Sequence, residues 1–384
     1  PVDVLSLDIN NDGADEMAFL FDGNPGSVVV YSVTGDGAAP VAIQGMQASV
    51  GNSPVDMDVA DLNGDGLDDL LVTNSGSSLN VLLIDSARGN EPSFSVSTIN
   101  VSSNDPMSLT CGAIIDWNKD GNLDAVVGVD VANEVLEDKY QVMINVATNS
   151  SENGPSFAVP MYLIGVEEVA DPPSCVDGLD SDGWGFVGGT TYGRLHRTDP
   201  SRATLQTLGQ LEGNKVTTIE VKDLDANGGD GIVDIMASSG AAKSIYLLQG
   251  EEDKADGFGD LIPLYVDAEI TDMLSIDPDR DGDIDYLIAT PGSGTSLSLL
   301  RTEGSSDTVR GGAKLSGQAY NRQDMDSVNE VERVTSGDLS PKDEEDDWTG
   351  GGNESSGPLL GGPIGSMDQI NIIPPDPGCA GDFS

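Results

Sequence analysis

The chain has 384 residues, of which 66 are Asp or Glu and 17 are Lys or Arg, so its formal net charge is −49. A surface this acidic excludes nucleic acid and anionic membranes as partners, because both require a basic face on the protein. No apolar stretch approaches the ~18 residues of a membrane span, so we expect no membrane insertion. The chain begins at Pro1 without a charged and then apolar leader. We expect it to be a mature or truncated fragment, so the missing leader does not argue against a secreted or cell-surface protein.

An acidic loop follows the first β-type segment of the chain, at residues 8–16. Oxygen-bearing side chains occupy positions 1, 3, 5 and 9 of this loop, and Gly13 occupies position 6. A hard divalent cation needs several oxygen ligands on a loop that bends sharply around the ion. The glycine allows that bend, because a Cβ would resist the backbone conformation required there.

The same loop returns along the chain, and we number the copies one to six in chain order. Clean copies follow loop one (8–16) at 61–69 (loop two), 116–124 (loop three) and 277–285 (loop six). Loop five, at 223–234, has extra residues before its last acid, and loop four, at 178–186, has Gly178 at position 1 and Phe186 at position 9. A repeat of about 45–60 residues is typical of propellers and solenoids.

The loops differ from EF-hands at position 12, where an EF-hand has a bidentate Glu between two helices. In the clean copies this position holds an apolar residue inside a β-type run: Phe19, Val72, Val127 and Ile288. Each loop therefore leads into a strand, and we expect the acid at position 9 to close the ion site.

Each unit contains an alternating lead-in segment, the acidic loop, an apolar run, a Gly/Ser/Asn turn, a further strand and a weaker fourth segment. Four short strands with this turn punctuation predict a propeller blade. We therefore predict an all-β fold, a β-propeller with six visible four-stranded blades. Six blades could close the ring, or seven if a segment before Pro1 supplies another.

The run from Val59 to Leu83 resembles an FG-GAP/VCBS repeat, the unit of integrin α-subunit propellers and of many secreted bacterial proteins. The resemblance covers residues 1 to about 315 and departs from the pattern in loops four and five. It implies a calcium-stabilised β-propeller and no single activity.

We expect about four or five Ca²⁺ ions, one for each loop with a full or stretched ligand set. The predicted side-chain ligands are Asp8, Asn10, Asp12 and Glu16; Asp61, Asn63, Asp65 and Asp69; Asp116, Asn118, Asp120 and Asp124; Asp223, Asp225, Asn227 and Asp234; and Asp277, Asp279, Asp281 and Asp285. Position 7 is predicted to coordinate through its carbonyl in the clean loops, at Ala14, Leu67, Asn122 and Asp283.

The chain divides at about residue 315. Residues 1–315 are predicted to form the propeller, with a candidate recognition insertion or simple hairpin extension at 132–138. Residues 316–384 are rich in Gly, Ser, Pro and acids and are predicted to be a largely disordered linker, although part of 302–335 could complete the last blade. Residues 377–384 resemble the start of a dockerin-like module.

Signals of catalysis are weak. A lone histidine such as His196 more often has a surface or packing role than a catalytic one. The glycines at 183–188 match G-x-G-x-x-G, but they follow a degenerate acidic loop and precede a strand-type segment. A dinucleotide site would instead need a strand before the motif and a helix after it. Nearly all paired carboxylates fall in the loops. Cys111 and Cys175, on neighbouring lead-in segments, are compatible with a disulfide or with two buried thiols.

The sequence favours a secreted or cell-surface, calcium-binding β-propeller that acts as a non-catalytic adhesion or ligand-binding module for a protein or polysaccharide. Two alternatives remain open: an enzyme or enzyme-attached module acting on extracellular polysaccharide, and a structural spacer of a larger surface protein. The oligomeric state is left open.

Overall fold

All regular elements are β-strands in the part of the chain that the structure, a computed structural model, describes. That part comprises residues 1–10, 16–32, 41–85, 92–101, 107–131, 139–145, 155–165, 171–179, 185–199, 204–212, 215–224, 232–239, 243–251, 257–265, 269–276, 285–289, 297–302, 320–324, 331–337, 347–352, 359–360 and 370–373. Within these residues, no helix is long and apolar enough to span a membrane.

The described strands form seven four-stranded sheets, which we call blades one to seven. Blade one contains β1 (Asp3–Leu7), β2 (Glu16–Phe21), β3 (Ser27–Ser32) and β4 (Val41–Ser49). Blade two contains β5 (Pro54–Ala60), β6 (Asp69–Asn74), β7 (Ser78–Asp85) and β8 (Ser93–Asn100). Blade three contains β9 (Met107–Ile115), β10 (Asp124–Val131), β11 (Lys139–Asn145) and β12 (Phe157–Gly165). Blade four contains β13 (Pro173–Gly178), β14 (Phe186–Thr190), β15 (Arg194–Asp199) and β16 (Thr204–Gln210).

Blade five contains β17 (Val216–Lys222), β18 (Asp234–Ser239), β19 (Ser244–Leu248) and β20 (Ile262–Tyr265). Blade six contains β21 (Asp272–Ile276), β22 (Asp285–Ala289), β23 (Leu297–Thr302) and β24 (Tyr320–Asp324). Blade seven contains β25 (Val331–Gly337), β26 (Asp347–Gly352), β27 (Leu359–Leu360) and β28 (Ile370–Ile373). Blades one to six are antiparallel meanders, whereas blade seven has the order β25-β26-β28-β27, with β26 and β28 parallel.

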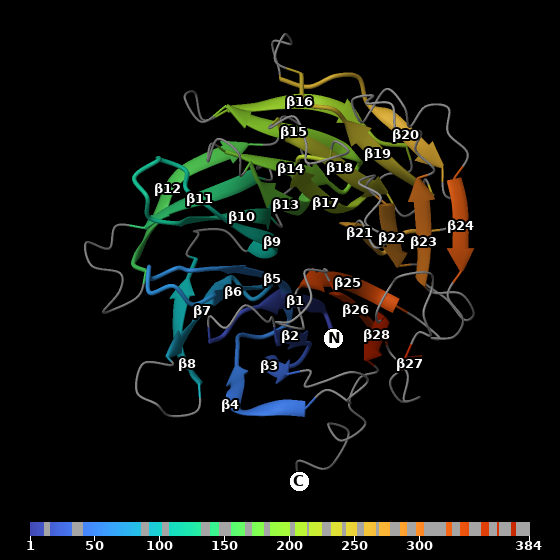
Figure 1. Cartoon of the computed structure of the whole chain (residues 1–384). Helices are drawn as coiled ribbons and strands as arrows, with labels where there is room; N and C mark the ends of the chain where they lie inside the picture. The colour runs from blue at the N-terminus through green and yellow to red at the C-terminus, as the bar shows by residue number, and fades with distance from the viewer. Residues whose placement is uncertain are drawn as a thin grey trace.

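The innermost strands of the seven blades form a closed ring. From β1 through β5, β9, β13, β17, β21 and β25, each innermost strand contacts the next, and β25 contacts β1. Figure 1 shows the blades arranged around these strands. The predicted all-β propeller is thereby confirmed.

The seventh blade differs from the expectation for the C-terminal part of the chain. β24 completes blade six, as the alternative for 302–335 allowed, whereas β25–β28 form a seventh blade that we had expected only from a segment before Pro1. The reason is that the average composition of 316–384 hides short β-type runs such as Ile370–Ile373. A short strand also gains from packing between two existing blades, which composition does not register. The recognition insertion at 132–138 and the dockerin-like ending at 377–384 lie outside the described residues.

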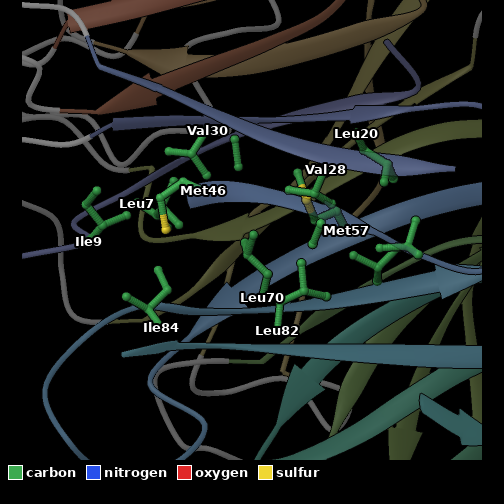
Figure 2. Close-up of a cluster of buried hydrophobic side chains, with 14 residues drawn as sticks. Leu7, Ile9, Leu20, Val28, Val30, Met46, Met57, Leu70, Leu82 and Ile84 are labelled. Atoms are coloured by element: carbon green, nitrogen blue, oxygen red, sulfur yellow. The ribbon is translucent and has the colours of Figure 1, made fainter. Parts of the chain in front are cut away.

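The second strand of a blade is buried on both faces because a neighbouring blade packs on each side. In β2, Ala18 and Leu20 belong to a cluster shared with blade two, whereas Met17 and Phe19 belong to a separate cluster. Side chains alternate between the two faces of a strand, so a strand that is buried on both faces reads as a continuous apolar run. Figure 2 shows the shared cluster, which includes Leu20 and Val28 of blade one and Leu70 and Leu82 of blade two.

Acidic side chains of the innermost strands bind backbone N–H groups of the next blade. Asp3 Oδ2 accepts a hydrogen bond from Met57 N at 3.0 Å, and Asp58 Oδ2 accepts one from Ile114 N at 2.6 Å. Asp177 Oδ2 accepts from Val221 N at 2.9 Å, and Glu220 Oε2 from Ser275 N at 3.0 Å. The sequence analysis did not predict that these acids link neighbouring blades. The signal that could have shown it is the placement of acids at alternating positions of the lead-in segments.

The outermost strands of blades one to five, β4, β8, β12, β16 and β20, contain no charged residue, although charged residues make up 22% of the chain. Each of these strands pairs on only one side within its sheet. Most of β8 is exposed, including Val96, at 43%. The charged residues of the protein therefore lie outside these five outer strands.

His196 and the two described cysteines are packing residues. His196 lies in β15 with 3% of its surface exposed, and its Nδ1 lies 3.3 Å from Thr207 Oγ1. Burial, assisted by the nearby charge of Arg194, lowers the pKa of His196 to about 4. Cys111 and Cys175 are free thiols in the structure, and burial raises the pKa of Cys175 to about 12. The packing interpretation of the histidine is confirmed.

The bonds between blades predict that Asp58→Ala destabilises the protein by about 2 kcal/mol, because the charged acceptor of Ile114 N–H is removed. The matched control is Asp22→Ala, which removes an exposed acid that accepts a hydrogen bond from its own neighbour, Gly23 N. Chemical unfolding in a chelator-containing buffer measures both variants. Equal destabilisation of the two variants would contradict a bridging role for Asp58.

The buried histidine predicts a pH dependence of stability. The folded-state pKa of about 4 lies below the ordinary 6.5, so below pH 6.5 the unfolded chain binds a proton that the folded chain does not. Stability from this group is therefore lost as pH falls from 6.5 to 4, by about 3 kcal/mol. The His196→Gln variant should lack this loss. The unfolding free energy of the wild type minus that of the variant should therefore decrease as the pH is lowered from 7 to 4. A flat difference curve would refute the assignment.

Candidate functional site

The acidic loops join the innermost strand of a blade to its second strand, so successive loops emerge on one face of the ring. Loop two connects β5 to β6 and loop three connects β9 to β10, and the structure describes both loops completely. No helix flanks either loop, which confirms that they are not EF-hands.

The other loops are described in part. Their predicted ligands at Asp12, Ala14, Asp225, Asn227, Asp277, Asp279, Asp281 and Asp283 lie outside the described residues. Asp8, Asn10, Glu16, Asp223 and Asp234 are described, and Asp285 begins β22. The geometry of the site is therefore taken from loops two and three.

In loop two the first three ligand positions surround the turn and accept its backbone N–H groups. Asp61 Oδ1 accepts from Gly64 N at 2.6 Å and Asp61 Oδ2 from Gly66 N at 2.8 Å. Asn63 Oδ1 accepts from Asp65 N at 2.8 Å, and Asp65 Oδ1 from Leu67 N at 3.0 Å. The side-chain oxygens at positions 1, 3 and 5 thus all face the backbone N–H groups of one tight turn.

Loop three repeats this arrangement. Asp116 Oδ2 accepts from Gly121 N at 3.0 Å, Asn118 Oδ1 from Asp120 N at 2.8 Å, and Asp120 Oδ1 from Asn122 N at 2.8 Å. The Asn122 N–H is the main reason why the pKa of Asp120 is lowered. Two loops that share no ligand residue therefore adopt one hydrogen-bond pattern.

The glycine at position 6 adopts a left-handed backbone, as predicted. Gly66 has φ +86° and Gly121 has φ +84°, values that a side chain resists. Position 4 is left-handed as well, at Gly64 (φ +76°) and Lys119 (φ +57°). Gly64 therefore suits position 4, because glycine adopts a left-handed backbone without strain. The sequence analysis did not use this residue as a signal.

The acid at position 9 is buried and joins the loop to the blade. Asp69 is fully buried, and its Oδ2 accepts from Leu62 N at 3.2 Å while its Oδ1 accepts from Ile84 N at 2.8 Å. Asp124 does the same with Trp117 N at 3.0 Å and Asn145 N at 2.7 Å. This anchoring role was not predicted for the position.

Loop five shares the same anchor. Asp234 accepts from Leu224 N at 2.9 Å and Gly250 N at 2.7 Å. The acid after the insertion therefore takes the place of position 9. In loop one, Glu16 Oε2 reaches Ile9 N at 3.4 Å, which is the loop-side half of the same contact.

The buried acids carry an electrostatic cost. Burial raises the pKa of Asp69 to about 7, and the nearby Asp65 and Asp61 charges add to the rise, although the N–H groups of Ile84 and Leu62 oppose it. Burial likewise raises the pKa of Asp124 to about 6. A cation beside these acids would favour their charged forms.

The donor types in loops two and three fit a hard divalent cation, because every predicted ligand atom is an oxygen and a carboxylate keeps acceptor capacity beyond one hydrogen bond per oxygen. Across the described residues, however, no group of three or more His, Cys, Asp or Glu side chains is gathered closely enough to hold a metal ion. The carboxylates instead accept hydrogen bonds from the backbone. Asp61, Asn63, Asp65 and Asp69 would hold an ion in loop two, and Asp116, Asn118, Asp120 and Asp124 in loop three.

Adjacent loops also contact each other. Asp8 N, at position 1 of loop one, donates to Asp68 Oδ2, at position 8 of loop two, at 2.8 Å. Ile9 and Leu67 belong to one apolar cluster, as do Leu62 of loop two and Leu123 of loop three.

The dinucleotide-type glycines do not form a nucleotide site. Gly185 precedes the strand β14, and no helix follows the motif, since the next described element is β15. A dinucleotide-binding turn requires a helix whose N-terminus faces the phosphates.

Comparison with known proteins identifies the repeat. Residues 8–72 and 61–127 match the model of an FG-GAP-like repeat, in agreement with the resemblance seen in the sequence. Each matched stretch begins at the first acid of a loop and ends in the second strand of the next blade. No curated protein matches the chain.

Solved structures with a similar fold include β-propellers. The Cps50 (Swd1) β-propeller domain of Myceliophteria thermophila is similar with a TM-score of 0.53 and 12% identity over 95% of both chains. Raptor of Chaetomium thermophilum is similar with a TM-score of 0.50 and 10% identity over 88% of this chain and 27% of that one. BBS1N, solved in complex with ARL6DN, has a TM-score of 0.48 and 14% identity over 77% of both chains. Identities this low show the fold alone.

The two kinds of acid in one loop predict different mutant behaviour. Asp124→Ala should cost about 3 kcal/mol of stability even in EDTA, because two buried N–H groups lose a charged acceptor, and more in calcium, because a predicted ligand is lost as well. Asp120→Ala, at an exposed position of the same loop, should lower the melting temperature only when calcium is present. Thermal unfolding in calcium and in EDTA measures both. A loss for Asp124→Ala that appears in calcium and not in EDTA would refute the anchoring role of position 9.

Proposed function

We propose that this β-propeller with FG-GAP-like repeats is a calcium-stabilised, non-catalytic module of a secreted or cell-surface protein, which binds an extracellular protein or polysaccharide. The observation that carries the proposal is the repeated turn of loops two and three, with its donors at positions 1, 3 and 5 and its buried acid at position 9. Bound calcium would supply two positive charges beside the carboxylates of loops two and three. The propeller supplies a rigid platform for binding.

The acids outside the loops support a non-catalytic role. The described innermost-strand carboxylates of Asp58, Asp177 and Glu220 accept backbone N–H groups of the next blade. His196 is buried, and its low pKa keeps it neutral at neutral pH. Groups committed in this way are poor proton donors or acceptors for a substrate.

The face opposite the loops offers a rigid aromatic contact. The turn between β14 and β15 lies at the other end of the strands and presents Tyr192, which is 53% exposed. Buried Asp171 fixes this turn by accepting from Tyr192 N at 2.9 Å and Thr190 Oγ1 at 3.0 Å, with Arg194 Nη1 at 3.4 Å. A preorganised exposed aromatic side chain is a common anchor for protein ligands and loses little entropy on binding.

The first test is a count of bound calcium by elemental analysis, together with thermal unfolding in calcium and in EDTA. We expect about four or five ions and a large fall in melting temperature on chelation, since a metal that binds only the folded state stabilises it. Asp65→Ala should remove one ion, and Asp22→Ala should remove none. A terbium titration adds a local signal, because Trp117 at position 2 of loop three should sensitise an ion there and Trp117→Phe should not.

Binding is tested with the same preparation on arrays of extracellular proteins and polysaccharides. A ligand captured by wild type in calcium, and lost both in EDTA and in Tyr192→Ala, would support the module. No bound ion and no shift on chelation would refute the calcium proposal, and turnover of an arrayed polysaccharide would refute the non-catalytic one.

A further inference from the structure

The outermost strand of blade two has an edge without a partner strand. β8 (Ser93–Asn100) comes last in the order β5-β6-β7-β8, and in the described part of the chain it pairs with β7 alone. It also contacts β4 of blade one, but β4 belongs to a different sheet. The other edge of β8, which we call its outer edge, lies at the periphery of the ring (Figure 1).

The pairing with β7 shows which backbone groups lie on the outer edge. Val101 N donates to Ser77 O at 3.0 Å, so these two residues form a hydrogen-bonded pair. In an antiparallel ladder, such pairs alternate with pairs that are not bonded to each other. The register is unbroken along β8, so its odd-numbered residues bond to β7. The N–H and C=O groups of the even-numbered residues point to the outer edge: Phe94, Val96, Thr98 and Asn100.

β8 lacks the features that block the other outermost strands. Proteins protect strand edges with charge, proline, bulges or short length. β4, β12 and β16 each have a register shift against the strand with which they pair, and β20 has four residues that include Pro263. β24 contains Arg322 and Asp324, and β27 has two residues. Among the outermost strands that the structure describes, β8 is therefore the one that a further strand can join over its whole length.

The side chains of β8 favour a partner strand with apolar residues at alternating positions. Phe94 is half-buried and packs against the apolar cluster shared by blades one and two. Val96 lies two residues further along, on the same face, and is 43% exposed. Aromatic and β-branched residues stabilise a sheet when they lie beside each other on neighbouring strands. A strand added at the outer edge can place such residues beside Phe94 and Val96.

Charge distinguishes between the strands that could occupy this edge. A second copy of the chain brings a further net charge of −49 and is repelled. A segment rich in Lys and Arg is attracted by the same field, which speeds its encounter with the protein. β8 itself is uncharged, so it places no like charge in the path of the incoming strand.

We propose that β8 binds an extended, positively charged segment of a partner protein, which joins blade two as a fifth strand. Backbone hydrogen bonds to the outward-facing groups supply the affinity, and alternate side chains supply the selectivity. The inference names a partner for the proposed binding module and rests on that function, but it requires no bound calcium.

The test uses the full chain and a fluorescent peptide of alternating Lys and Val residues, matched to β8 in length. One control peptide alternates Glu and Val, and the other is the Lys/Val peptide with every backbone nitrogen methylated, which keeps the charge and removes the N–H donors. Val96→Pro removes one outward N–H, a position at which an edge strand tolerates proline. Gln47→Pro is the matched control, because the same count along β4 places the Gln47 N–H on the outer edge of blade one.

Fluorescence anisotropy should show that the wild type binds the Lys/Val peptide and neither control peptide, and that added salt weakens the binding. Val96→Pro should weaken binding by about fivefold or more, whereas Gln47→Pro should stay within about twofold of the wild type. Hydrogen exchange over residues 93–100 should slow when the Lys/Val peptide binds, and exchange over residues 41–49 should not. Thermal unfolding checks that both variants are folded, and the methylated peptide tests the wild type independently of them.

Three results would overturn the inference. Equal binding of the methylated peptide, or equal weakening by both proline variants, would show adhesion to the acidic surface and not strand addition. A wild-type dimer that is lost in Val96→Pro would assign the edge to a second copy. An array ligand that depends on Tyr192 and not on Val96, with no Lys/Val peptide bound, would refute the edge and leave the proposed binding function standing. Peptide bound at β8 without any array ligand would support the edge and count against the face that presents Tyr192.

Discussion

The structure depends on how the ring satisfies the inner edges of its sheets. Each innermost strand is an edge strand of its own sheet, yet it lies inside the ring, where a backbone N–H without an acceptor is costly. Carboxylates of Asp3, Asp58, Asp177 and Glu220 supply acceptors from the preceding blade. The same bonds that remove this cost set the register of one blade against the next.

The acidity of the chain therefore has several causes. Some acids join blades, some anchor the loops to the third strand of the blade, and others surround the loop turn. The last group can exchange backbone donors for an ion at the smallest cost, because it lies nearest the surface. Asp69 and Asp65, four residues apart, illustrate the division, since one is fully buried and the other is exposed.

The sequence predicted the fold through its loops. Residues 61–69 revealed the repeat, the strand that follows it and the turn at Gly66, because local spacing and backbone chemistry determine these features. The anchoring by Asp69 could not be found in this way, since its partner Ile84 lies in β7 and only the folded blade brings them together. The contact between Asp8 and Asp68 likewise depends on blade packing, with sixty residues between them. Blade seven escaped prediction because its sequence is weakly patterned and two of its strands, β27 and β28, have only 2 and 4 residues.

Because the outer strands carry no charge, protection against edge-to-edge aggregation has to come from the rest of the protein. Proteins commonly protect an exposed strand edge with local charge or proline, and β8 (Ser93–Asn100) has neither. Whole-body repulsion between copies of net charge −49 takes over that protection. This repulsion acts over about 8 Å at physiological ionic strength and shrinks as salt or bound cations accumulate. Protection against aggregation thus depends on the net charge of the whole protein. Conditions that neutralise this charge would leave the uncharged outer strands open to pairing with strands of another copy.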